Sequence, residues 1–88
     1  MIDNILCLST AHISESTARH LDNDDLDIFL VGKNEYSYTL YSEFDPEANI
    51  PIDLRRVLEY AQSYDCRFVH LDCDEDIVPE LPRYEWGN

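Results

Sequence analysis

The densest group of side chains that could do chemistry is the acidic run Asp72-Cys73-Asp74-Glu75-Asp76, which follows directly on an apolar segment. Carboxylates at alternate positions are typical of calcium-binding loops. An EF-hand loop that began at Asp72 would need Gly at its sixth position and Glu at its twelfth, where this chain has Ile77 and Arg83. The run therefore does not fit a calcium loop, and we expect no metal here. A small metal-dependent enzyme is the remaining alternative, and it would require a stoichiometric metal at Asp72, Asp74 or Cys73.

Thiols and imidazoles elsewhere raise the questions of zinc and of nucleophilic catalysis. Cys66 and His70 would share one face of a strand and Cys73 would lie on the other, so the three converge as zinc ligands only if the strand has already ended. Cys7 and His12 have neither an orienting carboxylate at a suggestive spacing nor a Gly-rich oxyanion loop. Free or buried thiols and ordinary histidines are the simpler interpretation. The sequence predicts neither an enzyme nor a bound cofactor.

Charge is the strongest remaining signal. The 88 residues contain 19 Asp and Glu against 6 Lys and Arg, which gives a formal net charge of −13. Such a surface repels nucleic acid and anionic membranes and attracts basic proteins at long range. The alternative is that the carboxylates only keep a small domain soluble.

The acids are concentrated in residues 22–27, 43–47 and 72–76. Between His20 and Pro51 the only basic residue is Lys33. A folded array of carboxylates can present spaced negative charge as duplex DNA does, and so compete for the Lys and Arg of a nucleic-acid-binding protein. We predict that the acidic side chains of these segments bind such a partner. The predicted partner-binding residues are Asp22, Asp24, Asp25, Asp27, Glu35, Glu43, Asp45, Glu47, Asp72, Asp74, Glu75 and Asp76.

The elements that must position these acids follow from apolar patterning. Strands are predicted at residues 5–8, 28–31, 36–41 and 67–71, and helices at residues 14–21 and from residue 53. Ser14 and Asp53 are the expected N-caps of the two helices. The continuous apolar run at 28–31 is typical of an interior strand, and with 36–41 it forms a hairpin. This hairpin brings the acids of 22–27 and 43–47 to the same end of the sheet.

The order β-α-β-β-α-β is that of the ferredoxin-like sandwich. We therefore predict an α+β fold with a four-stranded antiparallel sheet and two helices on one face. A chain of 88 residues forms one domain, residues 1–88. Tyrosines on the open face of the sheet are either half-buried cover or a docking face.

The cellular location is predicted from what the chain lacks. No apolar run approaches the length of a membrane span, and the start has no basic signal-peptide region. Three cysteines without framework spacing favour a reducing compartment. We expect a cytoplasmic protein of a bacterial host.

Two stretches are distinctive, Leu8-Ser9-Thr10-Ala11-His12-Ile13-Ser14 and Leu81-Pro82-Arg83-Tyr84-Glu85-Trp86. They resemble an uncharacterised family of small acidic proteins of bacteria and mobile elements. In size, acidity and single-domain build the chain also resembles, by type and not by motif, phage anti-CRISPR proteins and DNA-mimic inhibitors. That likeness implies a non-enzymatic inhibitor of a host defence protein such as a CRISPR effector complex. The alternative function is an antitoxin or accessory interaction module that binds through the aromatic sheet face.

Overall fold

The computed structural model describes residues 4–34 and 37–86. In chain order the elements are β1 (Ile5–Ser9), a short 3-10 helix η1 (Thr10–His12), α1 (Glu15–Asp22), β2 (Leu30–Lys33), β3 (Ser37–Tyr41), α2 (Ile52–Ser63) and β4 (Phe68–Asp72). The predicted order of strands and helices and the α+β class are confirmed. Ser14 caps α1 as expected, because its hydroxyl accepts a hydrogen bond from the Thr17 amide at 3.2 Å.

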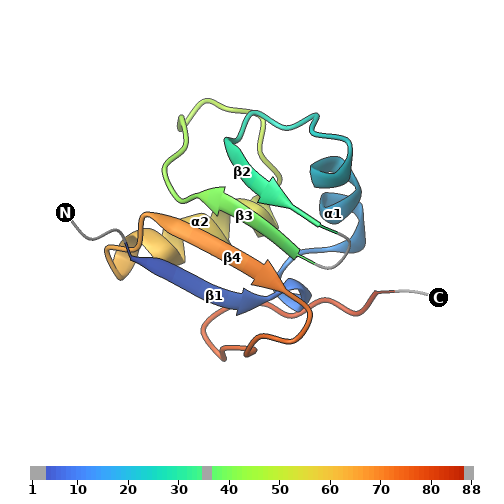
Figure 1. Cartoon of the computed structure of the whole chain (residues 1–88), viewed down its shortest axis with the longest axis vertical. Coiled ribbons are helices and arrows are strands. Elements are labelled where there is room, and N and C mark those ends of the chain that lie inside the picture. Colours follow the sequence, from blue (N-terminus) through green and yellow to red (C-terminus); the bar gives the residue numbers. More distant parts are fainter. Residues whose placement is uncertain (1–3, 35–36, 87–88) are drawn as a thin grey trace.

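The sheet is mixed, with the strand order β1-β4-β3-β2 (Figure 1). β4 pairs antiparallel with β3 but parallel with β1, and β2 pairs antiparallel with β3. The prediction of a fully antiparallel ferredoxin-like sheet is therefore wrong at the pairing of β1 with β4. Burial explains the order: Val69 and Leu71 of β4 are completely buried and require a central strand, whereas Ile5 of β1 is half-exposed at an edge.

The strand predicted at residues 28–31 is not an interior strand. β2 begins at Leu30 and forms the other edge of the sheet, where Phe29 is 66% exposed and Val31 is 47% exposed. Ile28 and Leu30 pack against the core, so the apolar run alternates between a covered face and an open one. An unbroken run of apolar residues therefore indicates apolar side chains on both faces here, not burial on both.

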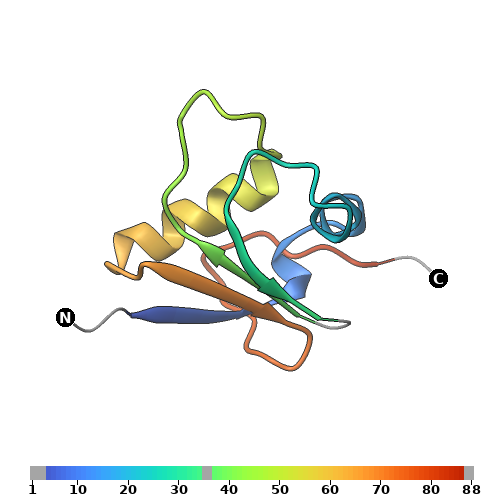
Figure 2. The same cartoon turned by 45° about the horizontal axis from the view of Figure 1, so that its top comes forward.

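Both helices lie on one side of the sheet, as predicted, and the opposite face is open (Figure 2). The stripe Leu54, Val57, Leu58 and Ala61 of α2 is completely buried, as its i, i+3, i+4, i+7 spacing predicts. It packs with Leu8, Leu40, Val69 and Leu71 of the sheet in a single core. No helix within residues 4–34 and 37–86 has the length and apolar character needed to span a membrane.

Asp53 does not cap α2, contrary to the prediction. The N-cap is Pro51, and the Asp53 side chain is buried and turned toward α1. Its carboxylate accepts hydrogen bonds from the Ser14 amide at 2.7 Å and from the Thr17 hydroxyl at 2.7 Å. A buried carboxylate is stable only when its oxygens are hydrogen-bonded, and the unpaired donors at the start of α1 supply those bonds.

Candidate protein-binding surface

The acidic segments 22–27 and 43–47 lie side by side at one end of the molecule, which we call the loop end. After α1 the chain turns sharply at Asp24, whose φ of 52° is left-handed, and Asp25 then receives a hydrogen bond of 2.9 Å from His20. The Asn49 amide lies 3.4 Å from a carboxylate oxygen of Asp27, which joins the two loops. The two loops therefore lie next to each other, as the predicted hairpin implies (Figures 1 and 2).

A cation from α2 holds the second acidic loop in shape. The Arg55 guanidinium donates to the carbonyls of Pro46 at 3.3 Å and Ala48 at 3.2 Å, and it lies 4.9 Å from the ring centroid of Phe44. The Asp45 carboxylate accepts from the Glu47 amide at 3.0 Å. The exposed carboxylates of Glu43 and Glu47 thus project from a loop whose backbone is tethered.

Asp22 differs from the other acids of these two loops because it accepts a hydrogen bond from a buried side chain of β3. The buried Tyr38 hydroxyl donates to the Asp22 carboxylate at 2.8 Å, and Lys33 donates to the Asp22 carbonyl. Burial, together with this carboxylate, raises the pKa of Tyr38 to about 12. We therefore exclude Asp22 from the side chains that are free to meet a partner.

An aromatic row crosses the open face of the sheet beside the acidic loops. Tyr41 pairs with Phe68 and Phe68 with Ile5 in the strand register, and the Tyr41 amide donates to the Phe29 carbonyl. The Phe29 and Tyr41 rings lie 5.0 Å apart and the Tyr41 and Phe68 rings 4.8 Å apart, measured between centroids. The row of Phe29, Tyr41, Phe68 and Ile5 is an apolar strip on the uncovered face.

Sequence reasoning anticipated tyrosines on this face but missed Phe29 and Phe68. The signal was present in the alternation of the strand residues, since Phe29 and Phe68 occupy the same face as Tyr41. The prediction that residues 28–31 form an interior strand, buried on both faces, is the reason why the exposure of Phe29 was missed.

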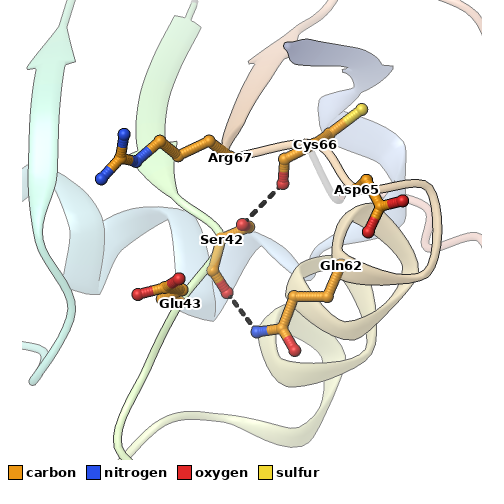
Figure 3. A pocket seen from close by; sticks show the side chains of 6 residues that line it. All are labelled: Ser42, Glu43, Gln62, Asp65, Cys66 and Arg67. Carbon is orange, nitrogen blue, oxygen red and sulfur yellow. Dashed lines mark hydrogen bonds between the residues drawn. The ribbon is translucent and has the colours of Figure 1, made fainter. Parts of the chain in front are cut away.

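A polar hollow of about 350 Å³ lies next to these loops, where α2 ends and β4 begins (Figure 3). Ser42 is at its centre: its hydroxyl donates to the Cys66 carbonyl at 2.7 Å, and its carbonyl accepts from the Gln62 amide at 2.6 Å. Glu43 and Asp65 lie on opposite sides of this hollow. The lining of the hollow thus combines the carboxylates of Glu43 and Asp65 with the Arg67 side chain.

The third predicted acidic segment is not part of this surface. Asp72 is the last residue of β4, at the end of the strand opposite to Phe68 and its partner Tyr41, and Asp74, Glu75 and Asp76 follow it. Glu35 lies outside the described residues. The predicted binding residues therefore fall on two separate ends of the molecule.

The two distinctive stretches of the sequence meet at this second end. Residues 76–86, which we call the strap, run along η1, and His12 is buried between them. The His12 Nε2 accepts from the Val78 amide at 3.0 Å, while the Nδ1 lies 2.8 Å from the Pro82 carbonyl. The Trp86 indole donates to the Ile13 carbonyl at 3.0 Å. These side chains hold the strap against η1.

Comparison with known proteins gives one match. Residues 5–86 match the model of DUF5983, a family of unknown function, in the part described as its C-terminal domain. No curated protein matches the chain, and no solved structure matches it. Nothing in these comparisons supports the likeness to anti-CRISPR or DNA-mimic proteins.

Proposed function

The chain belongs to the DUF5983 family, whose function is unknown, and we propose that it is a non-enzymatic binding module that occupies the basic, nucleic-acid-binding surface of another protein. The observation that supports this most directly is the convergence of two acidic loops, joined by the Asn49 amide at Asp27. Bound in this way, the module would inhibit a protein of host defence, such as a CRISPR effector complex, by displacing its nucleic acid.

Charge and tethering both favour the loop end as the contact. With a formal net charge of −13 the chain steers basic partners over long distances. Because Arg55 anchors the loop of residues 44–48, the exposed carboxylates lose little conformational freedom when they bind. The aromatic row lies on the adjacent open face of the sheet and begins beside these loops, at Phe29 and Tyr41.

The test is capture of nucleic-acid-binding proteins on immobilised full chain at low and high salt. We expect a basic protein to bind at low salt and to be released by high salt and by competitor DNA, because exposed charges are screened. Glu43→Lys combined with Glu47→Lys should abolish this binding. Glu59→Lys combined with Glu85→Lys changes the net charge equally at exposed sites elsewhere and is the matched control. Equal loss in both double variants would contradict the proposal.

Gln62 is unsuited as a neutral control because its amide donates to the Ser42 carbonyl and so holds the start of the acidic loop. A lysine there would change the shape of the loop as well as its charge. The comparison of loop-end and distant acids avoids this ambiguity.

The aromatic row supports a second candidate, an antitoxin or accessory module that binds through the sheet face. Phe29 is 66% exposed and in ring contact with Tyr41, so the row presents apolar area that water covers poorly. Binding that resists high salt and is lost in Phe29→Ser, but not in the loop-end double variant, would favour this candidate over the first.

A further inference from the structure

The donor atoms of three consecutive residues converge where β4 ends, at the end of that strand away from the loop end. Asp72, Cys73 and Asp74 each place one ligand atom, a carboxylate oxygen or the thiol sulfur, within 4.8 Å of the other two. Successive strand residues point to opposite faces, so this convergence requires the strand to have ended. It has, because β4 stops at Asp72 and the Glu75 amide closes a turn on the Asp72 carbonyl at 3.2 Å.

His70 adds an oriented imidazole to this group. Its Nε2 lies 3.4 Å from the Asp72 Oδ2, and its Nδ1 is held by the Thr39 hydroxyl at 2.9 Å. Histidines that bind metals usually have the second ring nitrogen fixed in this manner. Two ligands at about 2.0–2.1 Å from a tetrahedral zinc ion are about 3.4 Å apart, which is the spacing that His70 and Asp72 already have.

We infer that His70, Asp72, Cys73 and Asp74 form a binding site for a zinc-class divalent cation. The donor set selects the metal: a thiolate and an imidazole favour Zn²⁺, whereas Ca²⁺ and Mg²⁺ prefer oxygen ligands alone. Asp72 and His70 are partly exposed, with 29% and 28% of their side-chain surface accessible, so an ion reaches them without opening the fold. The site is independent of the proposed function, because it lies at the opposite end of β4.

The site also has a built-in reporter. Cys73 lines a hollow of about 400 Å³ together with Thr10, Ile77, Tyr84 and Trp86. Trp86 is the only tryptophan of the chain. Coordination of Cys73 changes the surroundings of this indole, and we expect the tryptophan fluorescence to change with the occupancy of the site.

The test uses the full chain, reduced and stripped with a chelator, titrated with Zn²⁺ by calorimetry and with Co²⁺ by visible absorption. We expect one equivalent to bind, a sulfur-to-cobalt absorption band, and release of protons, because a coordinating thiol ionises. Cys73→Ser should remove the cobalt–sulfur band and weaken zinc binding at least tenfold. His70→Ala should weaken zinc binding to a similar extent but keep the band, because the thiol remains. Cys66→Ser, which changes a thiol at the other end of β4, should leave both unchanged.

Several results would overturn the inference. One is a wild type that binds several ions weakly and to the same extent as Cys73→Ser, since that is adventitious binding to an acidic surface. Another is tight binding without a cobalt–sulfur band, which would exclude Cys73 as a ligand. Circular dichroism of each variant shows whether it is folded, and Thr39→Val gives a further check, since loss of the bond that orients His70 should weaken binding about tenfold without removing a ligand.

Discussion

The loop end and the strap end use their polar groups in opposite ways. At the strap end they form hydrogen bonds within the protein. Both ring nitrogens of the buried His12 face backbone partners in the strap, and the Trp86 indole donates to the Ile13 carbonyl. At the loop end the carboxylates of Glu43 and Glu47 project from an anchored loop into water. The contact between η1 and the strap holds the protein together, and we propose that the exposed carboxylates of the loop end meet a partner.

This difference explains why the most distinctive stretches of the sequence do not indicate a function. Residues 8–14 and 81–86 form the contact between η1 and the strap, so their residue types answer structural demands. The surface we propose for binding has no comparable motif, because an exposed carboxylate can be supplied by either Asp or Glu at many positions on a loop.

The largest expected loss of stability comes from removing the buried His12 side chain at the strap end. His12→Ala leaves the Val78 amide and the Pro82 carbonyl without their partner and opens a cavity in a buried site, so we expect a loss of about 3 kcal/mol in the free energy of unfolding. Urea denaturation measures it, with the exposed His20→Ala as control. Similar stabilities of the two variants would show that the strap adds little to the fold.

The next largest loss of stability is expected from removal of the buried Asp53 carboxylate at the start of α1. Asp53→Ala leaves the Ser14 amide and the Thr17 hydroxyl unpaired, and we expect a loss of about 2 kcal/mol by the same measurement. Asp53→Asn retains one acceptor and should lose less. A larger loss in Asn than in Ala would mean that the interaction is not hydrogen bonding to these donors.

A smaller effect depends on pH. Burial, together with the Asp22 carboxylate, raises the pKa of Tyr38 from its ordinary value of 10.0 to about 12, so the folded state favours the neutral phenol. The stability from this group is complete below pH 10 and is lost as the pH rises from 10 to about 12. Tyr38→Phe should therefore unfold less steeply over this range. Identical alkaline unfolding curves would contradict the role of the Asp22 contact.

The smallest expected effect is a gain at the loop end. Neutralising two of its acids with Glu43→Gln and Glu47→Gln relieves repulsion among neighbouring carboxylates, and we expect a gain of about 0.5 kcal/mol at low ionic strength that disappears in high salt. Thermal unfolding at the two salt concentrations measures it. A loss of stability would show that these side chains support the fold and weaken the contrast between the two ends.

Patterning within single elements could be predicted from the sequence, and pairings between distant ones could not. The Ser14 cap, the buried stripe of α2 and the convergence of the acidic loops all depend on local spacing and one hairpin. Parallel pairing of β1 with β4 depends on which strand is buried on its helix side along its whole length, a property of the assembled core.

The misassigned Asp53 and the missed aromatic row have the same cause. A carboxylate early in a helix predicts an N-cap. The Asp53 carboxylate instead accepts hydrogen bonds at the start of α1, because its burial requires several donors. The Phe29 ring is exposed because β2 is an edge strand. The residue types of β2 alone do not indicate that position in the sheet. Both outcomes were decided by tertiary packing.

The most direct test of the central claim is site-specific photo-crosslinking in bacterial cells. A photo-reactive side chain is placed either at residue 47, on the loop end, or at residue 85, in the strap. We predict a crosslink to a basic, nucleic-acid-binding protein from residue 47 and none from residue 85. A crosslink from residue 85 alone would place the binding surface on the strap end and contradict it.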